Sequence, residues 1–259
     1  MFSIHGSKLK KRSPLKNPPL RSPGQSVQEE IDRTADKFSE HAMLLGLAGF
    51  AAILEWIRWF FNSPPQPVVF TILAAGVAVF VIIKASKTRE RLRILRQGRD
   101  GEKVIGQCLE RLREGGYRVL HDIVGDGFNI DHVLIGPTGV YTIETKTISK
   151  PAKGSCEIVY DGEKVKVNGF TPDRDPVAQG KAQAGWIKGF LKEVVIKELS
   201  VRPVVLYPGW FVKPQPKGCE VWVLHPDVLP MFLKNEHTCL DRRDIQAIEG
   251  CLSAYVRKG

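Results

Sequence analysis

The chain has 259 residues, 43% of them hydrophobic, and this length accommodates one or two globular domains. Its formal net charge of +10 is uneven, because residues 1–98 hold 15 Lys and Arg against 7 Asp and Glu, whereas residues 99–259 hold 23 against 21. The charge therefore does not indicate a basic nucleic-acid binder throughout, and a membrane explanation for the excess comes first. Five cysteines without a Cys-x-x-Cys pair argue against a zinc ribbon or a disulfide framework and favour a reducing compartment.

The first part of the chain predicts a membrane anchor. Residues 1–41 are predicted to be a basic, largely disordered tail, because Lys, Arg, Pro and Ser dominate its beginning. Two apolar runs follow, AMLLGLAGFAAILEWIRWFF (42–61) and VVFTILAAGVAVFVII (68–83), and about 20 such residues span a bilayer. We expect a transmembrane helical hairpin over 42–85, with the lysine at 84 reaching the headgroups. The alternative, a buried hairpin of a soluble protein, is disfavoured because the runs are apolar on every face.

The charges that flank the runs predict an orientation. The connecting segment NSPPQP (62–67), which we expect to form a tight turn, carries no Lys or Arg, whereas basic residues flank both outer ends of the hairpin. By the positive-inside rule, both termini and the domain that follows lie in the cytoplasm. Glu55 and Arg58 are three residues apart and are expected to pair on one helix face, beside two interfacial tryptophans. Residues 86–97 are predicted to form a basic connector helix that lies on anionic lipid or is simply solvated.

From residue 98 the pattern predicts a soluble α/β domain with a mixed sheet, extending to residue 259. A helix is expected to begin at Asp100 as its N-cap and to end at Gly115-Gly116. The remaining expected elements, in chain order, are strands at 117–124, 129–135, 140–146 and 162–169, a helix at 176–194, strands at 202–209 and 219–226, and a helix at 241–258.

The second and third of these strands carry charges where a core is expected. The turn 136–139 between them pairs positions whose numbers sum to 275, so Asp131 faces Glu144, and Lys146 shares a face with Glu144. Opposed carboxylates repel unless a cation lies between them, and Mg²⁺ favours one or two carboxylates with water and phosphate oxygens. Lys146 would then steady the attacking water or the developing negative charge. The alternative is a surface hairpin with a wet polar face, on which Lys146 bridges the two carboxylates.

These residues resemble a known family. Gly101-Glu102 opening a helix, the run IDHVLIGPTGVYTIETK (130–146), and Pro176 followed by Gln179 are similar to the NERD, or nuclease-related, domain over roughly residues 98–230. That domain resembles the PD-(D/E)xK nucleases, whose restriction-endonuclease-like core has the order αβββαβ. The resemblance implies that Asp131 and Glu144 bind Mg²⁺ or Mn²⁺ and that Lys146 is the catalytic lysine.

The same resemblance implies that Glu102 reaches the site from the first helix as an accessory carboxylate and that Gln179 forms hydrogen bonds within the site. The superfamily's proline before the catalytic aspartate is Ile130 in this chain.

Other polar residues near the hairpin receive structural roles. His132 is expected on the sheet face opposite to Asp131, where packing or hydrogen bonding occupies it. Asp122 and Asp126 flank the preceding loop and are expected to be solvated. The sequence therefore predicts a membrane-anchored, metal-dependent nuclease that acts on phosphodiester bonds, with DNA as the expected substrate. The alternative is a non-catalytic membrane adaptor that binds nucleic acid or protein through the same fold.

Overall fold

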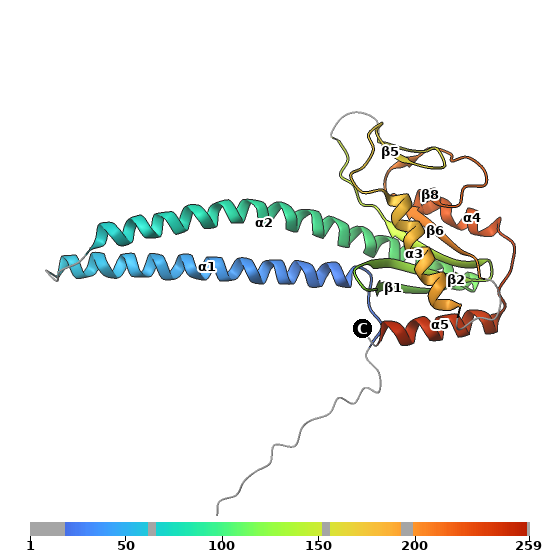
Figure 1. Cartoon of the computed structure of the whole chain (residues 1–259), viewed down its shortest axis with the longest axis horizontal. Coiled ribbons are helices and arrows are strands. Elements are labelled where there is room, and N and C mark those ends of the chain that lie inside the picture. The colour runs from blue at the N-terminus through green and yellow to red at the C-terminus, as the bar shows by residue number, and fades with distance from the viewer. Residues whose placement is uncertain (1–18, 62–65, 152–155, 193–198, 258–259) are drawn as a thin grey trace, which may run out of the picture.

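The computed structural model describes residues 19–61, 66–151, 156–192 and 199–257, so most of the expected tail and the turn at 62–65 lie outside the described residues. Two long helices, α1 (Gln25–Phe60) and α2 (Pro67–Glu110), run side by side and extend away from an α/β domain (Figure 1). The C-terminal end of α2 enters that domain and packs on its sheet. The helix α2 therefore runs without a break from the helix pair into the domain.

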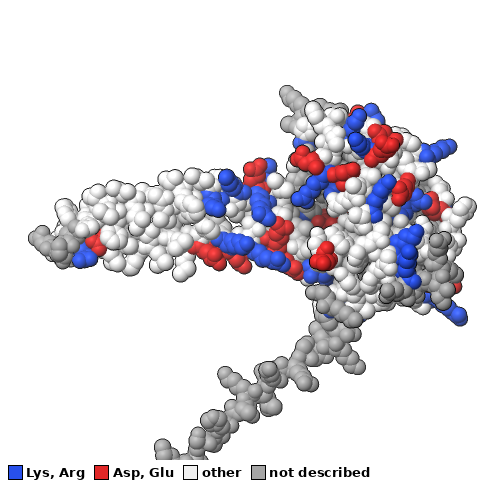
Figure 2. All heavy atoms as spheres, in the orientation of Figure 1, with Lys and Arg blue, Asp and Glu red and all other residues white. Residues whose placement is uncertain are grey.

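The apolar parts of the helix pair face outward. Leu47 is 56% exposed and Ile72 is 68% exposed, and the most apolar window of each helix is only 6% buried. Figure 2 shows charged side chains gathered on the part of the pair near the domain, with an almost uncharged surface beyond it. Both helices are long and apolar enough to cross a membrane. Within the described residues this chain does not bury them, which disfavours the alternative of a buried hairpin.

The structure corrects two expectations about the helices. The tail was predicted to be largely disordered through residue 41, but α1 already begins at Gln25, because residues 25–41 pack along α2 and form ion pairs such as Arg91–Glu30 at 2.7 Å. Asp100 is not an N-cap, because α2 continues without a break from the apolar run through the connector and Gly101. The expected end of this helix at Gly115-Gly116 is confirmed, with a short 3₁₀ turn, η1 (Arg111–Gly115), before it.

The domain is built on a five-stranded mixed sheet with the order β1-β2-β3-β6-β8. The strands are β1 (Arg118–Val124), β2 (Asn129–Gly136), β3 (Gly139–Thr145), β6 (Val201–Leu206) and β8 (Trp222–Leu224). β1, β2 and β3 are antiparallel, whereas β6 is parallel to β3 and to β8. The prediction of an α/β domain with a mixed sheet is therefore confirmed.

Helices cover both faces of this sheet. One core joins the sheet to α3 (Pro176–Leu191) and α5 (Arg242–Val256), and it includes Val133, Ile187 and Ile248. The other joins the opposite face to the end of α2 and to α4 (Leu229–Lys234). The order helix, three strands, helix, strand that the resemblance implied is present in the sequence α2, β1–β3, α3, β6.

The sequence did not indicate every element. Only β5 (Val165–Val167) of a second, three-stranded sheet was expected, and its partners β4 (Glu157–Tyr160) and β7 (Phe211–Val212) were missed. These strands are two to four residues long, too short for an alternating pattern. The expected helix at 176–194 ends at Leu191, and residues 193–198 lie outside the described part. The short turn η2 (Pro226–Val228) precedes α4.

The predicted β2–β3 register is confirmed. Ile135 pairs with Val140, Val133 with Thr142, and His132 with Ile143. The turn closes through Gly136 and Gly139, and Gly139 has a φ of 131°, a conformation that favours glycine. The pairing places Asp131 next to Glu144, at the end of the hairpin where β3 continues alongside β6.

Candidate active site

Asp131 lies near the start of β2 and Glu144 near the end of β3, on the sheet face that α3 covers. They are only 7% and 5% exposed. The backbone N–H of Thr145 donates a hydrogen bond of 2.7 Å to Asp131 Oδ2, which fastens this carboxylate to the neighbouring strand beside Glu144. The two carboxylates that the sequence paired are thus brought together in the structure.

Burial and like charge make ionisation of Asp131 costly. Desolvation raises the pKa of Asp131 well above its usual range, and the negative charges of Glu144 and Glu102 raise it further. The hydrogen bond from Thr145 and the charge of Lys146 act in the opposite direction but are weaker causes. A buried carboxylate in this position needs a positive partner to be ionised at neutral pH.

Glu102 reaches the same site from α2, as the resemblance implied. Gly101 makes this approach possible, because a Cβ atom there would lie 1.7 Å from Thr147 Oγ1, just beyond β3. Glu102 is 7% exposed, and burial raises its pKa from 4.5 to about 8, with the charges of Asp122 and Glu144 adding to the effect. Its buried Oε2 has no hydrogen-bond partner among the described residues. An unsatisfied buried carboxylate oxygen is costly and marks a position suited to a cation or an ordered water.

Lys146 follows β3 and points back to the carboxylates. Its Nζ donates to Glu144 Oε1 at 2.7 Å and to Gln179 Oε1 at 2.8 Å. The side chain is 22% exposed, so the ammonium remains within reach of an incoming substrate. Gln179, from the first turns of α3, therefore fixes the direction of the lysine. The resemblance implied a hydrogen bond of Gln179 within the site, and its partner in the structure is Lys146.

Gln183 is a further site residue that was not expected from the sequence. This residue is 3% exposed, and its Nε2 donates to Glu144 Oε2 at 2.6 Å and to the backbone carbonyl of Asn129 at 2.9 Å. Glu144 is thus held by Lys146 through one oxygen and by Gln183 through the other. The available signal was spacing, because Gln183 lies four residues after Gln179 and shares its helix face.

Asp122 was expected to be solvated, and this is wrong. It is fully buried, with a φ of 54°, and it accepts hydrogen bonds from Arg21, from Asn129 at 2.9 Å, and from both the backbone and the hydroxyl of Ser26. Arg21 and Ser26 come from the chain just before and within the start of α1, which lies far away in sequence, so the local pattern did not reveal them. Asp126, by contrast, is exposed as expected.

This contact, which we call the Asp122 clasp (Arg21, Ser26, Asp122 and Asn129), brings the start of α1 to the edge of the site. The backbone of Gly24 also forms a hydrogen bond with Glu102, which partly offsets the rise in its pKa. The helix pair therefore contributes to the environment of the site, and the domain does not form it alone.

His132 occupies the opposite side of the sheet, as expected. Its Nδ1 lies 2.9 Å from Nδ1 of His121, whose Nε2 lies 3.0 Å from a carboxylate oxygen of Glu110 on α2. Burial lowers the pKa of both imidazoles, so the rings are neutral and one donates to the other. This chain of side chains connects α2 to the sheet and takes no part in the carboxylate site.

The residues present offer carboxylate oxygens, the donors that a hard divalent cation prefers. No group of three or more His, Cys, Asp and Glu side chains arranged to hold a metal occurs among the described residues. The donors at the site are carboxylate oxygens of Asp131 and Glu144, with Glu102 nearby. This is the oxygen chemistry of Mg²⁺, which keeps several water ligands and needs only one or two carboxylates. The raised pKa values and the unsatisfied Glu102 oxygen suit a site that binds a cation.

Comparisons with known proteins place this site in a nuclease-related sequence. The family described as Nuclease-related domain matches residues 97–208, a stretch that contains Glu102, Asp131, Glu144, Lys146 and Gln179. An uncharacterized protein of Bacillus anthracis is 40% identical over 55 residues, which cover 19% of this chain and 26% of that protein. No solved structure matches the chain. The family match indicates a nuclease-like function for the domain.

Proposed function

We propose that this protein is a membrane-anchored, divalent-metal-dependent nuclease that hydrolyses phosphodiester bonds and that its substrate is DNA. The observation that carries the proposal is the convergence of Asp131, Glu144 and Lys146 within a stretch that matches a nuclease-related domain. Residues 98–259 would form the nuclease-like domain on a restriction-endonuclease-like core. Residues 42–85 would span the membrane twice, with both termini and the domain in the cytoplasm.

Each residue of the site has a distinct task in this proposal. Asp131 and Glu144 would hold Mg²⁺ or Mn²⁺, which supplies charge neutralisation at the phosphate and lowers the pKa of a bound water. The Lys146 ammonium orients the attacking water and stabilises negative charge that develops on the phosphate oxygens. Gln179 and Gln183 fix the directions of Lys146 and Glu144 through their hydrogen bonds.

Glu102 has a further role in the proposal. Its protonated form, favoured by a pKa of about 8, is neutral beside the other two carboxylates. On ionisation it adds an oxygen donor close to the cation position and increases the negative charge of the site. The occupancy of the cation and the protonation of Glu102 are therefore linked.

The second candidate is a non-catalytic membrane adaptor that binds nucleic acid or protein. The observation that favours it is charge, since residues 99–259 hold 23 Lys and Arg against 21 Asp and Glu. A non-specific nucleic-acid binder usually carries a larger positive excess. Nucleic-acid binding without metal-dependent turnover would favour this candidate over the nuclease.

The test is a cleavage assay on the full-length chain in detergent or nanodiscs. A fragment that starts at residue 97 would lack Arg21 and Ser26 and would leave Asp122 buried without them. Linear, circular and branched DNA and RNA would be incubated with Mg²⁺, Mn²⁺ or EDTA. We expect metal-dependent cleavage that Lys146→Ala abolishes, whereas Lys234→Ala, an exposed lysine on α4, leaves it unchanged.

A further inference from the structure

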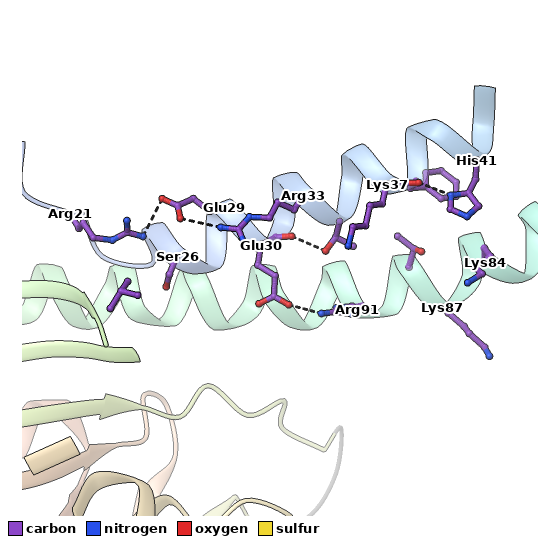
Figure 3. A pocket seen from close by; sticks show the side chains of 14 residues that line it. Arg21, Ser26, Glu29, Glu30, Arg33, Lys37, His41, Lys84, Lys87 and Arg91 are labelled. Atoms are coloured by element: carbon purple, nitrogen blue, oxygen red, sulfur yellow. Dashed lines mark hydrogen bonds and ion pairs between the residues drawn. The ribbon is translucent and has the colours of Figure 1, made fainter. Parts of the chain in front are cut away.

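A cavity of about 900 Å³ lies between α1 and α2, where their charged parts meet the apolar runs. Figure 3 shows basic side chains from both helices around it. The cations that line it are Arg21, Arg33, Lys37, Lys84, Lys87 and Arg91, with His41 at the end nearer the apolar runs. Arg21 and Ser26 line the cavity and also belong to the Asp122 clasp, but none of the lining residues is one of the proposed metal-binding or catalytic residues of the carboxylate site.

The acidic residues of the cavity do not neutralise it. Glu30 pairs with Arg91 at 2.7 Å, and Glu29 pairs with Arg21 at 3.1 Å and with Arg33 at 3.7 Å. Among the described residues, no carboxylate lies within ion-pair distance of the three lysines that line the cavity, Lys37, Lys84 and Lys87. The Lys84 ammonium lies 5.7 Å from the centroid of the Phe80 ring. A concave surface with three ammonium groups that form no ion pair with a described carboxylate attracts a phosphate-bearing ligand.

An apolar groove adjoins the cavity on the side of the apolar runs. It has a volume of about 330 Å³ and is lined by Leu44, Leu47, Leu73, Val77 and Phe80, among others. His41 lines both spaces, and its ring stacks on Phe80 with centroids 5.8 Å apart. Nδ1 of His41 lies 2.6 Å from the backbone carbonyl of Lys37, which holds the ring between the basic and the apolar part. The shape joins a site for an anion to a site for a hydrocarbon chain.

We propose that the cavity binds the phosphate headgroup of an anionic phospholipid and that the adjoining groove holds part of one acyl chain. A soluble phosphate would leave the apolar groove empty, whereas a phospholipid can fill both spaces. The adjoining basic and apolar spaces therefore favour the lipid. The site rests on the membrane anchor of the proposed function, because it lies at the depth where the helices would leave the cytoplasmic leaflet. The phosphate of the bound lipid places negative charge among the three lysines and fastens α1 to α2 near the domain.

The experiment uses the full-length chain in nanodiscs of phosphatidylcholine with or without phosphatidylglycerol. Native mass spectrometry of the released chain counts the phosphatidylglycerol that stays bound. The cavity variant is K37A/K84A/K87A. The matched control is R89A/R93A/R96A, which removes the same charge from exposed positions of α2 that do not line the cavity. We expect retained phosphatidylglycerol to fall about tenfold in the cavity variant and to remain near the wild-type level in the control.

Several results would overturn the proposal. Equal losses in both variants would mean that the lipid is attracted by general surface charge. Displacement of the lipid by inorganic phosphate at equal affinity would assign the cavity to a soluble anion, and lysine-dependent binding of a short DNA would assign it to nucleic acid. If alkaline carbonate extracts the protein from membranes, both the membrane anchor and the lipid site are wrong. A chain that stays integrated without selective retention would overturn the lipid site alone.

Discussion

The raised pKa of Glu102 leads to a quantitative prediction about stability and pH. In the unfolded chain this carboxyl titrates near 4.5, whereas in the folded chain its pKa is about 8. Between these values the folded chain keeps a proton that the unfolded chain has lost. The contribution of Glu102 to the free energy of unfolding therefore falls as pH rises from about 4.5 to about 8. The full displacement corresponds to at most about 5 kcal/mol, at about 1.4 kcal/mol for each pKa unit.

The substitution Glu102→Gln isolates this effect, because the amide is neutral throughout. In EDTA, we expect wild type and variant to have similar stability near pH 5 and the variant to be more stable by a few kcal/mol at pH 8. For a domain of this size that difference raises the unfolding midpoint by about 10 °C. The assay is thermal unfolding of the full-length chain in non-ionic detergent between pH 5 and pH 8.5. Glu163→Gln, at an exposed position in the loop between β4 and β5, is the control.

The same unfolding experiment is repeated in the presence of a divalent cation. A cation binds ionised carboxylates, so Mn²⁺ should stabilise the wild-type chain more at pH 8 than at pH 6. The pH dependence of this gain should weaken in Glu102→Gln. A pH slope that the substitution leaves unchanged, or a variant that is not more stable than wild type at pH 8 in EDTA, would refute the reasoning.

Three further substitutions test the supports of the site by urea unfolding of the full-length chain. Gln183→Leu removes two donated hydrogen bonds and leaves Glu144 with an unsatisfied oxygen, so we expect a loss of about 1–3 kcal/mol; an unchanged midpoint would speak against it. Arg21→Ala leaves Asp122 buried without its cation and should cost about 3 kcal/mol, with partial recovery when Asp122→Asn is added; full stability of the single variant would remove the Asp122 clasp from the account. Gly101→Ala forces α2 away from Thr147 and should cost about 1–3 kcal/mol, whereas a neutral effect would show that the helix has room to move.

The part of the site that the sequence predicted depends on local geometry. A four-residue turn fixes the register of its two strands, so the meeting of Asp131 and Glu144 followed from counting. Lys146 followed from the alternation of side chains along one strand. Gln179 and Glu102 were placed only by resemblance, because no local rule says which helix will lie over the hairpin.

The remainder depends on contacts between distant segments. Asp122 lies near the end of a strand and flanks a polar turn, a position that indicates solvent, but Arg21 and Ser26 reach it from about a hundred residues away. The continuity of α2 was hidden because Gly98 and Gly101 weaken helix propensity by about 1 kcal/mol each, less than packing against α1 and the sheet supplies. Strands as short as β4 and β7 show no alternation of apolar and polar residues from which a strand could be predicted.

The cleavage assay on the full-length chain tests the central claim most directly. Wild type and Lys146→Ala would be compared on DNA and RNA substrates, with Mg²⁺ or Mn²⁺ and with EDTA, after matching unfolding curves show that both are folded. We predict that cleavage needs the metal and that its rate falls at least a hundredfold in Lys146→Ala, because this substitution removes a group that stabilises transition-state charge. Metal-independent cleavage, equal cleavage by both proteins, or no cleavage of any substrate by the folded wild type would contradict it.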